Sequence, residues 1–185
     1  GTMANNGAAD QVYDLARQSV LQEKIFGGPL NGMEPFFYPP IYLIVCAALA
    51  CLPYLAGFAL WVIATGAAFV AVLWRIARDW KLAVALCSFP PTIITLGLGQ
   101  NAFVTATLLG AGVLLADESP WLAGLAFGAL CFKPHFLVLV PLALLAGRRW
   151  RSLAGAALTV AVLVGVSVLW FGVAPWRAFI AHIPQ

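Results

Sequence analysis

Long apolar runs separated by short polar breaks dominate the chain from residue 39 onwards. Two of these runs, residues 54–74 and 152–171, are long enough to cross a bilayer as helices, which takes about 20 apolar residues. The run at 41–52 is too short to cross, and Pro53 separates it from the next one. The pattern therefore predicts two uninterrupted membrane-spanning helices, at 54–74 and 152–171.

Two further apolar stretches, residues 82–116 and 121–147, are interrupted near their middles. The first contains a Pro-Pro pair at 90–91 and a glycine-rich break at 97–101, which predicts two short helices that meet at the glycine-rich turn. The second contains a Lys-Pro-His break at 133–135 and is expected to turn there. Short and broken helices of this kind are tolerated in a membrane where they line a cavity.

Residues 1–37 form the only extended polar region. Within it, residues 8–25 carry apolar side chains at intervals that suit an amphipathic helix. Residues 175–183 suit an interfacial helix. We predict an extracytoplasmic loop with an amphipathic helix over residues 1–37, and a transmembrane helical domain over residues 38–185.

The amino-acid composition indicates that this chain lies in a lipid bilayer rather than in water. Hydrophobic residues make up 63% and charged residues only 9%, against roughly 25% charged in a soluble domain. So few charges could not cover the core of a soluble fold of this length. Because each spanning segment in lipid must satisfy its own backbone, we predict an all-α, polytopic transmembrane helical bundle with several short or broken helices.

The positions of the positive charges predict the orientation. Six of the ten Lys and Arg residues lie in two short clusters, Arg75-Arg78-Lys81 and Arg148-Arg149-Arg151. Clusters of this kind mark cytoplasmic loops. Four polar breaks then fall outside: the N-terminal loop, the 100–101 turn, the 133–135 turn and the loop after Gly172. No basic domain exists outside the apolar runs, so no nucleic-acid partner is expected.

Lys133 is the sharpest chemical signal, because an ammonium group in an apolar run is costly unless it is paired, snorkels or lines a wet cavity. It suits an anchor for a phosphate, with His135 beside it; the alternative is a snorkelling lysine at a helix end. Gln100 and Asn101 suit hydrogen bonding to a sugar, although Asn101 also suits the N-cap of the next helix. Tyr38 suits a ligand contact or an interfacial tyrosine.

Asp10 and Asp14 are the outer-loop carboxylates near Tyr13, and either is a candidate general base or a solvated surface group. The four cysteines lie in apolar runs without metal-ligand spacing. No nucleotide-binding loop, dinucleotide fingerprint or nucleophilic triad is present. The sequence therefore predicts no metal ion and no cofactor.

The chain carries an ordered set of short motifs: Gly7–Asp14, Phe37-Tyr38-Pro39-Pro40, Leu52-Pro53-Tyr54, Phe89-Pro90-Pro91, Leu98-Gly99-Gln100-Asn101, Phe132-Lys133-Pro134-His135, Ala146–Arg151, Phe171-Gly172 and Pro175-Trp176. Together these motifs resemble glycosyltransferase family 87, the polyprenyl-phosphate-mannose-dependent membrane mannosyltransferases of the GT-C class. The resemblance implies an inverting transferase that moves a sugar, often mannose, from a polyprenyl-phosphate donor. The acceptor would be a glycolipid or polysaccharide on the outer face of the cytoplasmic (inner) membrane.

The resemblance also implies an aspartate general base in the first outer loop, just after a first transmembrane helix and upstream of Tyr13. Asp10 and Asp14 are the catalytic candidates present, but we expect the true base to lie outside this sequence, which we expect to be a fragment. Relatives often have Gln after Lys-Pro, where this chain has His135. Two other readings stay open at this point, a transporter or flippase-type protein and a non-catalytic scaffold.

Overall fold

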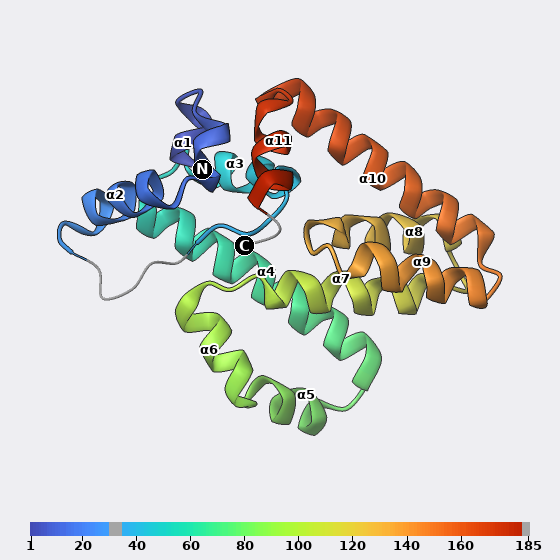
Figure 1. The fold of residues 1–185 in the computed structure, drawn as a ribbon. Helices are drawn as coiled ribbons and strands as arrows, with labels where there is room; N and C mark the ends of the chain where they lie inside the picture. The colour runs from blue at the N-terminus through green and yellow to red at the C-terminus, as the bar shows by residue number, and fades with distance from the viewer. Residues whose placement is uncertain (30–34, 183–185) are drawn as a thin grey trace. The chain divides into compact units, whose positions relative to one another are not determined.

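The computed structural model describes residues 1–29 and 35–182, and every regular element in these ranges is a helix (Figure 1). This confirms the predicted all-α class. The chain forms two compact units, unit 1 (Gly1–Leu52 with Leu163–Gln185) and unit 2 (Pro53–Val162), each described here by itself. The predicted division at residue 37 concerns the membrane boundary and stays a prediction.

The elements follow one another without any strand in the described ranges. In chain order they are α1 (Thr2–Asn5), the 3-10 helix η1 (Ala9–Tyr13), α2 (Leu15–Phe26), α3 (Ile41–Leu49), α4 (Tyr54–Ala77), α5 (Trp80–Cys87), α6 (Pro90–Leu98), α7 (Ala102–Leu115), α8 (Pro120–Ala129), the 3-10 helix η2 (Leu130–Phe132), α9 (Phe136–Ala146), α10 (Trp150–Phe171) and α11 (Ala174–His182).

Two described helices are long and apolar enough to cross a membrane, and they are the two predicted spans. The 24 residues of α4 and the 22 residues of α10 correspond to about 36 and 33 Å at 1.5 Å per residue. The hydrocarbon core is about 30 Å thick, so both helices reach across it. The membrane character of the chain is therefore confirmed.

The stretch between α4 and α7 differs from the prediction in one respect. A single short helix was expected before the glycine-rich turn, but the structure holds α5 and α6, bent by 58° and able to form a third, broken span. The bend falls at Ser88-Phe89, directly before Pro90 and Pro91. Proline lacks a backbone N–H and disfavours helical conformation in the residue before it, so the helix ends there and restarts with proline in its first turn.

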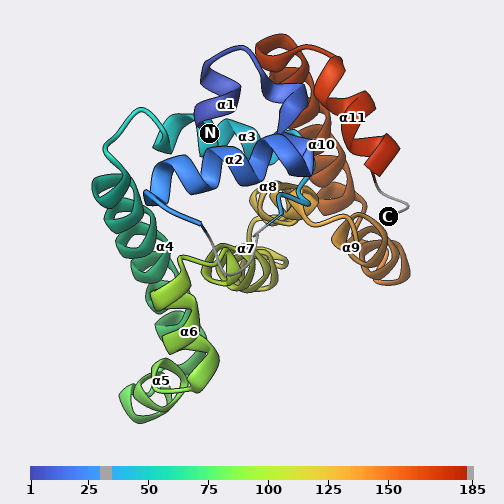
Figure 2. The same cartoon turned by 60° about the vertical axis from the view of Figure 1, so that its left-hand side comes forward.

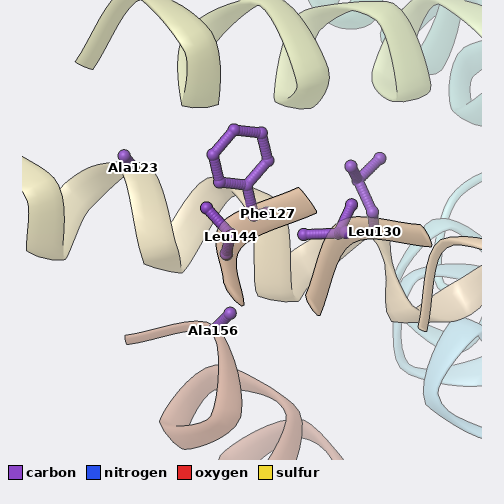
Figure 3. Close-up of a cluster of buried hydrophobic side chains, with 6 residues drawn as sticks. Ala123, Phe127, Leu130, Leu144 and Ala156 are labelled. Carbon is purple, nitrogen blue, oxygen red and sulfur yellow. The ribbon is translucent and has the colours of Figure 1, made fainter. Parts of the chain in front are cut away.

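Helices α7 and α8 of unit 2 run side by side (Figures 1 and 2). Small residues allow close packing in this unit. Gly124 and Gly128 of α8 lie against the backbone of α10 at Gly155 and Ala156. The core beside this contact consists of Ala123, Phe127, Leu130, Val140, Leu144 and Ala156. Figure 3 shows the Phe127 ring pointing from α8 towards α7, where Gly112 leaves room for it. Because lipid tails are as apolar as these side chains, association depends on this close backbone approach.

In unit 1, short helices pack around a second apolar cluster. Its buried members are Ala4, Ala9, Val12, Leu43 and Ala47. The amphipathic helix predicted over 8–25 divides into η1 and α2 at Asp14, whose extended backbone (φ −82°, ψ 105°) is that of an N-cap residue. The predicted helix at 175–183 is confirmed as α11 over Ala174–His182; residue 183 lies outside the described residues.

Candidate functional site

Unit 2 has two distinguishable ends, because its helices run along one another in known directions. Trp61 of α4 contacts Gly99, and Val72 lies against Gly110, so α4 and α7 run the same way. Arg149, at the start of α10, contacts Ala116 at the end of α7. We call the end that holds residues 75–81 and 148–151 the arginine end.

The two predicted polar turns both lie away from the arginine end of unit 2. Residues 99–101 precede α7, whereas the arginine end lies beyond the last turn of α7. Leu130 of η2 packs in the same cluster as Leu108 of α7, so the chain has run back from the arginine end when it reaches Lys133. Gln100, Asn101, Lys133 and His135 therefore all lie away from the arginine end, and their grouping into one outer site stays a prediction.

Backbone hydrogen bonds fix the turn that carries Lys133. The Lys133 N–H donates to the carbonyl of Leu130 (2.9 Å), and the Phe136 N–H donates to the carbonyl of Lys133 (3.0 Å). Lys133 itself is extended (φ −113°, ψ 104°) and ends η2, while His135 precedes the first residue of α9. The His135 ring lies beside Phe136 with centroids 4.5 Å apart, and the residue is exposed. The turn thus presents a cation and an imidazole on a rigid backbone.

No carboxylate of unit 2 compensates Lys133. The acidic residues of this unit are Asp79, Asp117 and Glu118, which all belong to the arginine-end loops. Lys133 is half-buried and forms no ion pair within residues 1–29 and 35–182. Burial lowers the pKa of the Lys133 ammonium from its ordinary value, because desolvation disfavours the charged form. A charge in this setting favours an anionic ligand.

A hydrogen bond from a distant tryptophan holds the Gln100-Asn101 turn in place. Gly99 has a left-handed backbone (φ 62°), and Trp61 Nε1–H donates to its carbonyl at 3.0 Å. A Cβ at Gly99 would stand 2.8 Å from the Phe58 ring, so glycine is needed for both reasons. Asn101 is buried at the N-cap of α7 without a side-chain cap hydrogen bond, whereas Gln100 is exposed. The Gln100 amide is therefore the one open to a ligand.

Tyr38, Asp10 and Asp14 belong to unit 1. The Tyr13 hydroxyl donates to the carbonyl of Tyr38 at 2.8 Å, and the Tyr38 ring lies 4.7 Å from that of Tyr42. Asp10 is exposed at the second residue of η1. The expected cavity shared by Tyr38 and the four residues of unit 2 would join the two units, and it stays a prediction.

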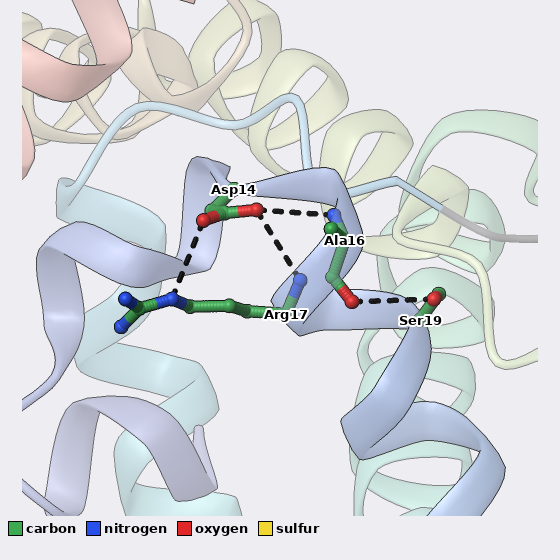
Figure 4. Close-up of polar contacts among 4 residues, drawn as sticks. All are labelled: Asp14, Ala16, Arg17 and Ser19. Atoms are coloured by element: carbon green, nitrogen blue, oxygen red, sulfur yellow. Dashed lines mark hydrogen bonds and ion pairs between the residues drawn. The ribbon is translucent and has the colours of Figure 1, made fainter.

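Asp14 has a structural role in the described geometry (Figure 4). Its Oδ1 accepts hydrogen bonds from the N–H groups of Ala16 (3.1 Å) and Arg17 (3.2 Å), and its Oδ2 lies 3.4 Å from Arg17 Nε. This is the N-cap arrangement of α2, which satisfies orphan donors of the first turn. Of the two candidate carboxylates, only Asp14 makes such contacts within residues 1–29 and 35–182, and Asp10 is exposed.

Two residues that fix loops of unit 2 carried no signal in the sequence pattern. Trp61 looks like any aromatic residue in a span, and its role depends on a partner 38 positions away. Arg149 looked like one charge of a loop cluster, but its Nη1 donates to the Ala116 carbonyl and lies 2.7 Å from Asp117 Oδ1. The available clue to such a pair is an acidic residue directly after one apolar run and an arginine shortly before a later run.

Comparison with known proteins gives one match. The model of the family described as glycosyltransferase family 87 matches residues 36–185. The matched range contains Tyr38, Gln100, Asn101, Lys133 and His135 and leaves out Asp10 and Asp14. Neither the search of curated proteins nor the search of solved structures found a match.

Proposed function

The chain belongs to glycosyltransferase family 87 and is a membrane glycosyltransferase, and we propose that it takes its sugar, mannose, from a polyprenyl-phosphate donor. The proposed acceptor is a glycolipid or polysaccharide on the outer face of the cytoplasmic membrane. Membership of this family supports the transferase activity. The position of Lys133 and of the positive loops in unit 2 supports the choice of donor and of membrane face.

The observation that carries the donor proposal is the uncompensated cation at Lys133. Lys133 is the only Lys or Arg between Lys81 and Arg148, and in the proposed topology it lies towards the end of unit 2 opposite the arginines. Positive loops face the cytoplasm, so this end faces outward in the proposed topology. A lipid-borne phosphate brings its charge to the membrane surface, where a half-buried ammonium on a rigid turn can hold it.

The charge change during transfer gives Lys133 a catalytic role. The acceptor hydroxyl oxygen attacks the anomeric carbon, and the bond from that carbon to the phosphate oxygen breaks with its electron pair. The phosphodiester, with one negative charge, becomes a phosphate monoester with a second developing charge, while a carboxylate base accepts the hydroxyl proton. A cation beside the phosphate attracts the doubly charged leaving phosphate of the transition state more strongly than the singly charged bound donor. This difference lowers the activation barrier.

Gln100 and His135 are the proposed sugar contacts at the same end. Both are exposed, and both lie on turns whose backbone is fixed by hydrogen bonds. Tyr38 is proposed as a further contact from unit 1. The general base is not assigned within the described residues: Asp14 is occupied as a helix cap, and Asp10 is the remaining candidate.

The test measures transfer of radiolabelled sugar from polyprenyl-phosphate-mannose into lipid and polysaccharide fractions by the full-length protein. Lys133→Ala should lower kcat roughly 100-fold, the scale of losing one transition-state charge contact. Lys81→Ala is the matched control, because Lys81 is an exposed lysine of the arginine end. Absence of transfer by a well-folded protein would refute this donor, and equal loss in both variants would refute the role of Lys133.

A further inference from the structure

A cavity of about 390 Å³ lies at the arginine end of unit 2, away from the proposed donor site. It is lined by the loop between α7 and α8 and by the turn from α9 into α10. The side chains that matter here are Arg148, Arg149, Trp150, Arg151 and Ser152. Neither the sugar transfer nor the choice of donor uses any of them.

Two of the three arginines at this cavity carry a positive charge that no acidic residue within the described ranges neutralises. Arg149 is engaged with the Ala116 carbonyl and with Asp117, which is the carboxylate of the cavity lining. Arg148 and Arg151 are exposed and form no ion pair within residues 1–29 and 35–182. Guanidinium groups bind phosphate oxygens in bidentate fashion, so this lining is suited to an anion.

A buried hydroxyl and the start of α10 lie at the same cavity. Ser152 is fully buried, and its Oγ has no hydrogen-bond partner in the described structure although it belongs to the lining. Ser152 is the third residue of the 22-residue α10, so it lies among the first-turn N–H groups that lack intrahelical acceptors. These donors and the helix dipole favour a phosphate at this position.

The level of the cavity in the membrane indicates where such a phosphate comes from. Helix α10 is long and apolar enough to span, so its first residues lie at a membrane interface. Trp150, which is 61% exposed, begins the helix in the position that interfacial tryptophans take at the headgroup level. Basic pockets between helices on the cytoplasmic side are suited to anionic headgroups.

We propose that this cavity binds the phosphate headgroup of an anionic phospholipid of the cytoplasmic leaflet. Arg148 and Arg151 contact the phosphate oxygens, and the first turn of α10 supplies backbone N–H donors. The acyl chains of the lipid lie against the apolar surfaces of the neighbouring helices. The site is separate from the donor site and does not depend on the proposed donor or acceptor; its assignment to the cytoplasmic leaflet rests on the proposed topology.

Two arginines with the same backbone conformation provide a matched pair of variants. Arg148 (φ 52°) and Arg78 (φ 49°) both have the left-handed conformation that favours glycine, and both belong to arginine-end loops. Arg148→Gly and Arg78→Gly therefore each remove one positive charge and relieve the same backbone strain. Only Arg148 lines the cavity.

The experiment titrates the detergent-solubilised full-length protein with phosphatidylglycerol and with phosphatidylcholine and measures bound lipid by native mass spectrometry. The unmodified protein should prefer phosphatidylglycerol, and Arg148→Gly should weaken its binding roughly tenfold, the scale of one charge-assisted contact. Arg78→Gly should bind like the unmodified protein. Should Arg148→Gly fail to fold, Arg151→Gln replaces it, since Arg151 is exposed and also lines the cavity.

Three results would overturn the proposal. The first is an unchanged affinity in the Arg148 variant, and the second is equal weakening by Arg78→Gly, which would indicate diffuse attraction to a basic surface. The third comes from adding inorganic phosphate as a competitor. If inorganic phosphate displaces phosphatidylglycerol at a similar concentration, the site takes soluble phosphate and the lipid assignment is wrong.

Discussion

Gly124 is a position where the packing of unit 2 leaves no room for an added methyl group. A Cβ there would stand 2.4 Å from the Ser152 carbonyl oxygen and 2.9 Å from both Ala156 N and Gly155 Cα. All three are backbone atoms of α10, so no side chain can rotate to make room. Gly124→Ala therefore forces α8 and α10 apart, towards the ordinary contact distance of about 3.5–4.0 Å.

The separation also disturbs the core beside the contact, where Ala123 is fully buried and Ala156 is 6% exposed. Forcing extra atoms into a close-packed contact costs about 1–3 kcal/mol. For a chain of about 150–250 residues, 1 kcal/mol shifts the Tm by roughly 2–4 °C. We therefore expect Gly124→Ala to lower the Tm by about 2–12 °C.

Thermal unfolding of the detergent-solubilised full-length protein, followed by tryptophan fluorescence, measures this shift. The matched control is Gly165→Ala, because Gly165 lies inside α10 and nothing stands within 4 Å of its Cβ position. Alanine there should leave the Tm unchanged or raise it, as alanine favours a helix over glycine. An unchanged Tm for Gly124→Ala, or an equal drop for Gly165→Ala, would refute the packing argument.

Three further outcomes are expected. Asp14→Ala should lower stability by about 0.5–2 kcal/mol through loss of the α2 cap, whereas Asp14→Asn, which can still cap, should lose less; urea-dependent proteolysis of the segment measures both. Trp61→Phe should loosen the turn at Gly99 and raise amide hydrogen exchange there, because one hydrogen bond contributes about 0.5–1.5 kcal/mol; unchanged exchange would contradict this. Burial lowers the pKa of Lys133, so its charge is present at low pH and is lost as pH rises towards that pKa. Sugar transfer should therefore fall on the alkaline side, and Lys133→Arg should remove this decline, since arginine stays charged.

The sequence pattern predicted the parts of the fold that depend on local chemistry. Lipid permits only segments that satisfy their own backbone, so the apolar length of 54–74 and 152–171 was enough to place two spans. Proline and glycine placed the turns at 99–101 and 133–135 because their backbone preferences act locally. The bend between α5 and α6 also has a local cause in Pro90 and Pro91, although the expected single helix ignored it.

What the pattern left out depends on contacts between distant residues. Nothing near Trp61 indicates that its indole reaches Gly99, and nothing near Ser152 indicates that its backbone lies against Gly124. The same holds for the site. The arginines at 148–151 were recognised as a topology marker, but the cavity they line exists only because the α7–α8 loop lies against the start of α10.

The central claim is that the turn carrying Lys133 and His135 opens on the side of the membrane opposite the arginines. The measurement uses a full-length variant in which every native cysteine is replaced by alanine and which still transfers sugar. Single cysteines are then introduced as His135→Cys and, at the other end, Lys81→Cys; both native residues are exposed.

Intact cells are treated with a membrane-impermeant maleimide, and labelling is compared before and after permeabilisation. The account predicts that the cysteine at 135 is labelled in intact cells and that the cysteine at 81 is labelled only after permeabilisation. Labelling of both positions from the same side, or of position 135 only after permeabilisation, would contradict it.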